Sequence, residues 1–252
     1  MTTITVCQRK GGNGKSTSAI SLAHAFALMG KRVLLVDLDD QKNSTSAIPV
    51  LTDEGATVED LLSDGAMTVS TAARATSWPG VFLVASSSRL SGVIRELDAE
   101  PGGHLVLGEK LAGAPFDICL IDTSPSLNIL VVNALCASRY AFIPLSSRYF
   151  SLQGLCQTLE AIAKITGRLN ASLSVLALAF VIHDGRSGLA REVVAKAREA
   201  YPALVCQSLV GQNIKIEEAQ VLRKSIFDYA PGDRGATQYR ALALELLEKM
   251  GG

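Results

Sequence analysis

The sequence lacks an excess of charge of either sign. Among its 252 residues, 24 lysines and arginines balance 24 aspartates and glutamates, so the formal net charge is 0. A chain-wide basic surface for nucleic acid is therefore excluded, and only a local basic patch remains open. The five cysteines are scattered and form no Cys-x-x-Cys pair, which predicts reduced thiols in a cytosolic protein rather than a disulfide framework.

Long apolar runs are missing as well. No run reaches the roughly 18 residues that a transmembrane helix needs. The first basic pair is followed by glycines instead of the apolar core of a signal peptide. We therefore expect a cytoplasmic protein with no membrane partner. Hydrophobic residues make up 48% and charged residues 19%, a composition that supplies a core and argues against disorder.

Short apolar, β-branched runs alternate with longer stretches of helical period. Several of these runs are apolar almost throughout, as are strands buried on both faces of a parallel sheet. The runs that predict strands are Thr3 to Cys7, Arg32 to Leu38, Val81 to Ala85, Asp117 to Asp122, Tyr140 to Leu145, Leu173 to Ile182 and Ala203 to Leu209. The alternation predicts an α/β fold, a doubly wound and mostly parallel sheet with helices on both faces.

The helical pattern is clearest after Lys15, where an apolar stripe at helical spacing ends at Gly30, a natural stop. The other predicted segments are helices from about Gly188 to Ala200 and Thr237 to Met250, and loop-rich stretches from Thr52 to Pro79 and Asp98 to Gly103. Because there is no internal repeat and no long linker, we predict that residues 1–252 form a single domain.

A glycine-rich segment joins the first predicted strand to the first predicted helix. It reads Gln8-Arg9-Lys10-Gly11-Gly12-Asn13-Gly14-Lys15-Ser16-Thr17. Glycines let backbone N–H groups converge on an anion, and a helix N-terminus adds partial positive charge. We predict a phosphate-binding loop in which Gly11, Gly12, Asn13 and Gly14 surround the phosphates. Lys15 would reach the β- and γ-phosphates, Ser16 would bind Mg²⁺, and Thr17 would lie beside the α-phosphate.

The loop departs from the standard pattern, which needs a glycine six residues before the lysine. That position is Arg9, and an extra lysine follows at Lys10. The order Lys-Gly-Gly-x-Gly-Lys-Ser-Thr resembles the variant Walker A loop of the ParA/MinD family of P-loop ATPases, closest to its ParA-type partition members. The resemblance implies ATP and Mg²⁺ as cofactors and slow, partner-stimulated ATP hydrolysis. It also implies a homodimer bridged by ATP, in which Lys10 reaches the partner's nucleotide as an arginine finger would. The alternative for Lys10 is an ordinary solvated lysine.

Acidic residues end the second predicted strand, in the run Asp37-Leu38-Asp39-Asp40-Gln41-Lys42-Asn43. Ligands of open α/β sheets bind at the carboxyl ends of strands, where acidic side chains need a metal or water. The run resembles the family's Val-Asp-x-Asp-Pro-Gln-Gly-Asn segment. By that match Asp39 orients or activates the attacking water and Asp37 helps to organise Mg²⁺. Asp40 replaces the proline and Lys42 the glycine, which puts the loop's rigidity and hydrolysis rate in doubt. The alternative is a cluster that caps the following Ser/Thr-rich segment.

The fourth predicted strand ends in Asp122, the position of a Walker B carboxylate that helps to hold Mg²⁺. The alternative is a strand-end cap. The segment resembles the family's Asp-x-x-x-x-Asp-x-x-Pro-Ser pattern with Ser124 where proline is common, and the residues from Thr123 to Ser126 would sense the γ-phosphate.

Weaker matches to the family extend over the carboxyl half. Asn213 through Ala219 resembles an Arg-Asn-x-x-Leu-x-Glu-Ala stretch, although Gln212 stands where arginine is frequent. Asn213 is therefore a candidate adenine contact, with a turn asparagine as the alternative. The closing stretch Ala241 to Met250 holds two acids and one lysine, so it predicts a helix packed on the sheet rather than a basic membrane anchor.

The resemblance implies an ATP-dependent dimerising switch that binds DNA non-specifically, associates with the nucleoid and positions a plasmid, chromosome or protein assembly through a ParB-like or other adaptor. Candidate DNA contacts are Arg186, Lys215, Arg223 and Lys224, each with solvated surface charge as the alternative. Two other functions remain open on the same scaffold: a metabolic ATP-dependent enzyme or reductase ATPase, and a membrane-cycling MinD-like ATPase. A reductase partner would need cysteines placed for an iron–sulfur cluster, which the sequence does not offer in a recognisable motif.

Overall fold

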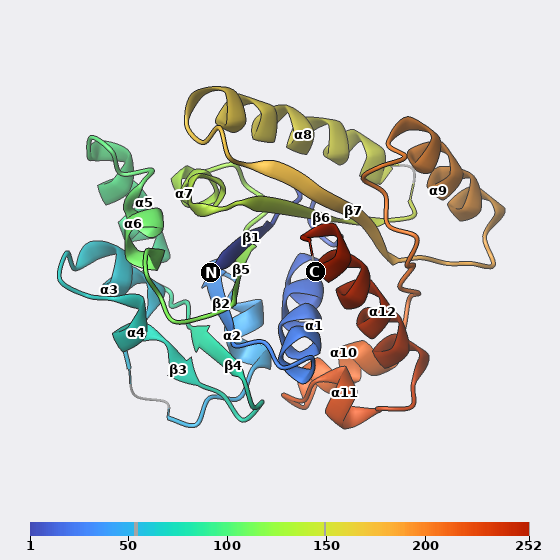
Figure 1. Cartoon of the computed structure of the whole chain (residues 1–252), viewed down its shortest axis with the longest axis horizontal. Helices are drawn as coiled ribbons and strands as arrows, with labels where there is room; N and C mark the ends of the chain where they lie inside the picture. The colour runs from blue at the N-terminus through green and yellow to red at the C-terminus, as the bar shows by residue number, and fades with distance from the viewer. Residues whose placement is uncertain (53–54, 149, 252) are drawn as a thin grey trace.

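The computed structural model describes residues 1–52, 55–148 and 150–251. Within them, seven strands form one sheet in the order β3-β4-β2-β5-β1-β6-β7 (Figure 1). The strands are β1 Thr2–Val6, β2 Val33–Leu38, β3 Arg74–Ala75, β4 Val81–Val84, β5 Ile118–Thr123, β6 Tyr140–Ser146 and β7 Ser174–Ile182. Every pairing is parallel except β3 with β4. This mostly parallel sheet confirms the predicted fold class.

Helices cover both faces of the sheet (Figure 1). They are α1 Lys15–Leu28, α2 Asn43–Ala47, α3 Val58–Ser63, α4 Val69–Ala72, α5 Leu90–Ala99, α6 Val106–Leu111, α7 Ile129–Ala137, α8 Phe150–Arg168, α9 Gly188–Ala200, α10 Ile214–Val221, α11 Ile226–Tyr229 and α12 Arg234–Lys249. Alternate residues of β2 enter different cores: Val33 and Leu35 pack with α1 and α12, whereas Leu34 and Val36 pack with α3, α5 and α7. A third core lies between β6, β7 and the helices α7, α8 and α9. Burial of both strand faces explains why these strands read as continuous apolar runs.

One predicted strand is wrong, and one observed strand was not predicted. The run Ala203 to Leu209 forms no strand: Val205 makes an isolated bridge to Leu178 of β7, and the next bridge, between Gly211 and His183, lies beyond both the run and β7. Its ladder is interrupted because the N–H groups of Gln207 and Ser208 donate to the Glu245 carboxylate of α12, at 2.8 and 2.9 Å. The strand that was not predicted is β3, which has two residues and lies inside the stretch predicted to be loop-rich.

That loop-rich stretch, Thr52 to Pro79, also holds the short helices α3 and α4, and its residues 53–54 lie outside the described part of the chain. The other loop-rich prediction, Asp98 to Gly103, begins in the last turn of α5 and then continues as turns. The helix predicted over Gly188 to Ala200 is confirmed as α9, and the last predicted helix begins three residues earlier, at Arg234.

Gly30 ends α1 as predicted, with a φ of 81° that favours glycine. The closing helix α12 buries Tyr239, Leu242 and Leu246 in the core shared with α1, as expected for a helix packed on the sheet. None of the helices in the described residues is long and apolar enough to span a bilayer.

His24 links α1 to two neighbouring segments inside the core. Its ring stacks on Trp78, with centroids 5.0 Å apart and an angle of 6° between the planes, and meets Phe227 edge-on. Burial lowers the pKa of His24, opposed by Asp228, whose carboxylate lies 3.8 Å from Nδ1. The folded protein therefore holds this imidazole neutral at pH values where an unfolded chain protonates it.

The sign of the resulting pH dependence follows from proton linkage. Below a pH of about 6.5 the unfolded state binds a proton at His24 that the folded state resists, so the free energy of unfolding falls as the pH is lowered from about 7 to about 5. The variant His24→Phe keeps a stacking ring and removes the titration, so its unfolding free energy should depend less on pH in this window. Urea titrations at several pH values measure the difference between the two proteins. Parallel curves would contradict the prediction.

Candidate nucleotide site

The phosphate loop runs from the end of β1, the strand between β5 and β6, to the start of α1. Gly12 and Gly14 adopt left-handed backbone angles, with φ of 72° and 76°. A Cβ atom added to Gly14 would lie 2.9 Å from Cγ2 of Val181, so a side chain is excluded there by space as well as by conformation. The loop therefore curls in front of the helix N-terminus, an arrangement that presents N–H groups to an anion.

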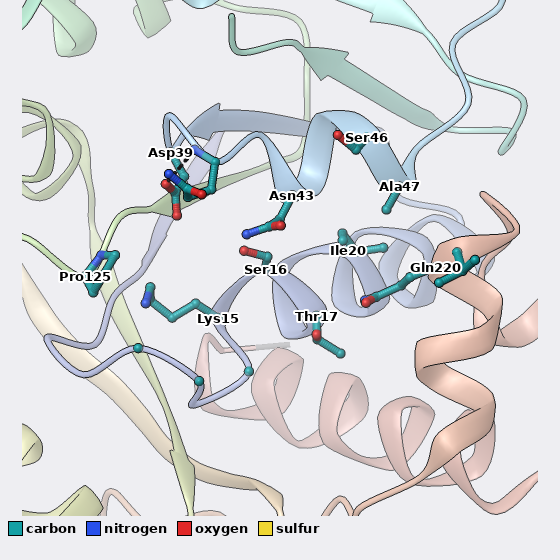
Figure 2. Close-up of a pocket in the computed structure, with 15 residues that line it drawn as sticks. Lys15, Ser16, Thr17, Ile20, Asp39, Asn43, Ser46, Ala47, Pro125 and Gln220 are labelled. Carbon is teal, nitrogen blue, oxygen red and sulfur yellow. Dashed lines mark hydrogen bonds between the residues drawn. The ribbon is translucent and has the colours of Figure 1, made fainter. Parts of the chain in front are cut away.

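A cavity of about 660 Å³ opens in front of this loop (Figure 2). This volume lies within the range of small-molecule sites. The cavity is lined by Gly11, Gly12, Gly14, Lys15, Ser16, Thr17, Ile20, Asp39, Gln41, Asn43, Ser46, Ala47, Pro125, Gln220 and Val221. Figure 2 shows Lys15 and Ser16 rising from the start of α1, with Asp39 and Asn43 on the opposite wall and Gln220 of α10 closing one side. All the predicted loop residues from Gly11 to Thr17 except Asn13 thus surround one hollow.

Lys15 is the buried cation of this cavity, with 7% of its surface exposed. Burial lowers the pKa of Lys15, while the nearby carboxylates of Asp122 and Asp39 raise it. Its side chain lies at the first position of α1, beside the glycines, where a phosphate would be received. Lys15 is therefore placed to neutralise an anion held by the loop.

Asp37 and Asp122 are register partners at the ends of the adjacent strands β2 and β5. Parallel register partners share a face, and here the face is the one covered by α1 and α2. Asp122 is fully buried, and burial, followed by the charge of Asp37, raises its pKa to about 7. Its Oδ2 accepts a 2.7 Å hydrogen bond from Ser44 of α2, whereas Oδ1 accepts none from the described residues. An unsatisfied buried carboxylate oxygen needs a further donor or a cation.

The carboxylate of Asp37 already has several hydrogen-bond donors. Its carboxylate accepts hydrogen bonds from the N–H of Asp39 at 3.1 Å, and from the N–H and hydroxyl of Thr45 at 2.8 and 2.7 Å. Burial raises the pKa of Asp37 to about 6 against these bonds, which lower it. Asp37 therefore holds α2 to the end of β2, the role left open by the capping alternative, and it does not line the cavity.

Asp39 does line the cavity, and only 4% of its surface is exposed. Burial raises its pKa, and the neighbouring Asp40 raises it further. Asp40 is exposed and accepts a hydrogen bond from the side chain of Gln41. The next departure from the family pattern, Lys42, has a left-handed φ of 55°, a conformation that favours the glycine it replaces.

The metal-binding prediction can be tested against the donors that are present. The described residues contain no group of three or more His, Cys, Asp or Glu side chains that could hold a metal ion alone. Mg²⁺ usually keeps several waters and takes only one or two protein oxygens beside substrate phosphates. Ser16 and the open Oδ1 of Asp122 fit that incomplete set, in which phosphates supply the remaining ligands.

Five predicted nucleotide or metal residues lie apart from the cavity lining: Lys10, Asn13, Asp37, Asp122 and Asn213. Lys10 is exposed on the other part of the loop. The side chain of Asn13 is buried, and its Oδ1 accepts hydrogen bonds from Ser146 and Ser151, at 3.0 and 3.1 Å, while its Nδ2 has no partner among the described residues.

Asn213 caps α10 by accepting from the Lys215 N–H, and it donates to Asp233. It also lines a neighbouring hollow of about 170 Å³ that includes Gly14 and Thr17 of the phosphate loop. The adenine contact stays a prediction, beside the turn role that these bonds provide.

The four predicted DNA contacts are dispersed over two regions. Arg186 precedes α9 and pairs with Asp184, whereas the other three surround α10. Lys215 lies 3.4 Å from Asp233, Arg223 donates to the Ile48 carbonyl, and Lys224 is exposed.

Several residues of the site were not predicted as site residues from the sequence. The short helix α2 supplies Asn43 and Ser46 to the cavity and Ser44 to Asp122, and its Ser/Thr-rich composition was the available hint. Gln220 and Val221 belong to α10, about 200 residues from the loop, and no motif marks them. Two contacts bring them there: Ile216 of α10 lies in the core that contains α1, and Arg223 donates to the carbonyl of Ile48, which follows α2.

Comparison with known proteins agrees with this geometry. The family model described as an AAA domain matches residues 1–175. The chromosome-partitioning ATPase Soj of Treponema pallidum is 37% identical over 251 residues, covering 99% of this chain and 98% of its own length. The chromosome partitioning protein ParA of Caulobacter vibrioides is 32% identical and covers 98% of this chain and 94% of its own length. This chain belongs to the ParA/MinD family of P-loop ATPases.

A solved structure supports the same assignment from the backbone. Cobyrinic acid a,c-diamide synthase of Mycobacterium smegmatis, determined with an ATP analogue and magnesium, superimposes with a TM-score of 0.85. It is 27% identical to this chain, covers 99% of it, and 96% of that structure is matched. Membership in the ParA/MinD family therefore rests on nearly the whole chain and not on the loop alone.

Lys15→Ala should weaken Mg-ATP binding by about 10- to 100-fold or more, because a charge-assisted contact to phosphate is lost. Isothermal titration with Mg-ATP measures the change. The variant Lys164→Ala, which removes an exposed lysine of α8, serves as the control and should bind as the wild type does. Equal affinities in both variants would show that Lys15 does not serve the phosphates.

Proposed function

We propose that this chain is a partition or positioning ATPase that works as an ATP-dependent dimer. Mg-ATP closes a homodimer, the dimer binds DNA non-specifically, and a cargo-bound adaptor of ParB-like or other type triggers hydrolysis and release. The observation that carries the proposal is the pair Lys10 and Lys15 in one loop, of which only Lys15 lines the loop's own cavity. Similarity to two chromosome-partitioning proteins over nearly the whole chain supports the same conclusion.

The cavity supports Mg-ATP as the cofactor of this reaction. Its size, its two left-handed glycines and its buried lysine fit a triphosphate, and the solved relative contains an ATP analogue with magnesium. Magnesium, when bound, would neutralise phosphate charge, and Ser16 and the open Oδ1 of Asp122 would help to hold it, while Asp37 would act indirectly by fixing α2 beside them. Lys15 binds the β- and γ-phosphates, and Asp39, on the opposite wall, orients or activates the attacking water.

Lys10 is proposed to bind the nucleotide of another subunit. It lies outside the cavity of its own subunit and is exposed. In the proposed dimer it reaches the nucleotide of the partner subunit, where its ammonium neutralises the charge that develops during phosphoryl transfer. Dimer formation then depends on a bound triphosphate, which makes nucleotide state the switch.

We propose that the protein is cytoplasmic and associates with the nucleoid. The proposed DNA contacts are Arg186, Lys215, Arg223 and Lys224. All four are exposed or partly exposed at the surface, three of them around α10, next to the nucleotide cavity. Because such binding rests on phosphate contacts, its affinity should fall steeply with salt.

A metabolic ligase is the second candidate, since the solved relative is named as a synthase. Its identity of 27% is lower than the 37% shared with the partition ATPase. The reductase version is disfavoured, because Cys119 is buried within β5 and no metal-binding group of cysteines occurs in the described residues. Partition is therefore the function that the observations favour.

ATP turnover measured with and without DNA and the adaptor tests the proposed function. The partition function predicts turnover that rises when both are added, together with DNA binding that is lost at high salt. Turnover that is indifferent to both additions would favour the ligase alternative.

Lys10→Ala should leave Mg-ATP binding within about twofold of the wild type while dimerisation with ATP is lost, because the residue lies outside its own cavity. Light scattering behind size-exclusion chromatography, with a slowly hydrolysed ATP analogue, measures the dimer. Lys164→Ala again provides the control. A Lys10→Ala protein that dimerises normally would refute the role in trans.

Asp39→Ala should retain the ATP dimer but lose most of its turnover, since a positioned general base typically contributes about 10²- to 10⁴-fold to a rate. Phosphate release under single-turnover conditions measures the loss. Asp40→Ala, which removes the exposed neighbouring carboxylate, should keep measurable turnover. Normal hydrolysis by the Asp39 variant would remove this residue from the mechanism.

A further inference from the structure

The first turns of α8 lie directly against the part of the phosphate loop that precedes the glycines. Thr158 of α8 is buried, and its hydroxyl accepts a 3.2 Å hydrogen bond from the N–H of Arg9. The same hydroxyl lies 2.8 Å from Oε1 of Gln8 and 2.7 Å from the carbonyl of Gly154, so its single proton serves one of these acceptors at a time. One threonine therefore holds both the backbone and the side chain of the Gln8–Arg9 segment.

Gly154 lies one turn before Thr158 on the same face of α8. A Cβ atom added to Gly154 would lie 3.1 Å from Oε1 of Gln8 and 3.2 Å from Cβ of Lys10. Both distances are tighter than ordinary contacts, so the loop would have to move. Glycine weakens a helix interior relative to alanine, and close approach of another backbone is the usual physical reason for it.

The two glycines that follow Lys10 are less closely packed. Cβ atoms added to Gly11 or Gly12 would meet nothing within 4 Å. Lys10 thus stands between the Gln8–Arg9 segment, which contacts α8, and two glycines with open space beside them.

We propose that Gly154 and Thr158 are positioning residues that hold the Gln8–Lys10 segment in the conformation from which Lys10 is presented to a second subunit. That Lys10 reaches a second subunit is taken from the proposed function, on which this inference rests. That α8 holds the segment before it is taken from the contacts of Thr158 and Gly154. Neither residue lines the nucleotide cavity, so both act on Lys10 and not on the nucleotide of their own subunit.

Gly154→Ala tests the close approach, and Gly167→Ala is its matched control in the same helix. A Cβ atom at Gly167 meets nothing within 4 Å, so the control makes the same chemical change without a contact. Gly154→Ala should weaken ATP-dependent dimerisation by about tenfold or more, because a tightly packed contact is displaced. Its Mg-ATP affinity should stay within about twofold of the wild type, since the contact lies outside the cavity, and Gly167→Ala should match the wild type in both measurements. If Gly154→Ala lost ATP affinity in parallel with dimerisation, or lost neither, the positioning role would be overturned.

Thr158 can be tested by a pair of substitutions that separate its shape from its hydroxyl. Thr158→Val keeps the shape and loses the hydrogen bonds, so it should weaken dimerisation by about tenfold. Thr158→Ser keeps the hydroxyl and should restore dimerisation to nearly the wild-type level. A serine variant as weak as the valine variant would overturn the role assigned to the hydroxyl.

Amide hydrogen exchange without nucleotide separates this inference from the proposed function. The Arg9 amide should exchange faster in Thr158→Val than in the wild type, and the 8–10 segment faster in Gly154→Ala than in Gly167→Ala. A wild-type protein that stays monomeric with ATP would overturn the proposed function, and faster exchange would then still support placement of the segment by α8. Unchanged exchange in both variants would overturn the placement itself.

Discussion

Two carboxylates buried side by side at the ends of β2 and β5 impose the main constraint on this molecule. Asp37 and Asp122 are register partners with no exposed surface, and burial raises the pKa of both, to about 6 and about 7. Burying two carboxylates at the carboxyl ends of neighbouring strands costs free energy unless hydrogen-bond donors or cations are present. The fold supplies donors from α2, through Ser44 and Thr45, and one ammonium from α1, that of Lys15.

These donors leave the site short of positive charge. Lys15 faces Asp122 and Asp39 together, and one oxygen of Asp122 accepts no hydrogen bond from the described residues. Magnesium and phosphates, when bound, would supply what is missing: Asp122 would help to hold the metal, and the loop and Lys15 would hold the phosphates. The buried carboxylates and the phosphate loop therefore favour a metal and an anion bound together.

The sequence predicts this site well where its parts are local. The loop, its lysines and the carboxylates that end β2 and β5 follow from strand, turn and helix signals within a few residues. The failures involve distant partners: the run Ala203 to Leu209 has strand composition, but Glu245 of α12 takes two of its N–H groups. The side chain of Asn13 likewise turns away from the cavity, because Ser146 and Ser151 offer it two donors that only the folded chain brings near.

The departures from the family pattern after β2 show how far backbone shape can outlast a change of residue type. Lys42 occupies a left-handed position where glycine is expected, at a cost of about 1 kcal/mol. Its N–H donates to the Asp39 carbonyl at 3.0 Å and its own carbonyl accepts from Ser46 at 2.8 Å, while Asp37 binds the N–H of Asp39. The turn is thus held by hydrogen bonds at both ends, and the carboxylate of Asp39 lies in the cavity with Lys42 in the turn. The placement of Asp39 therefore depends on the buried Asp37 rather than on a proline and a glycine in the loop.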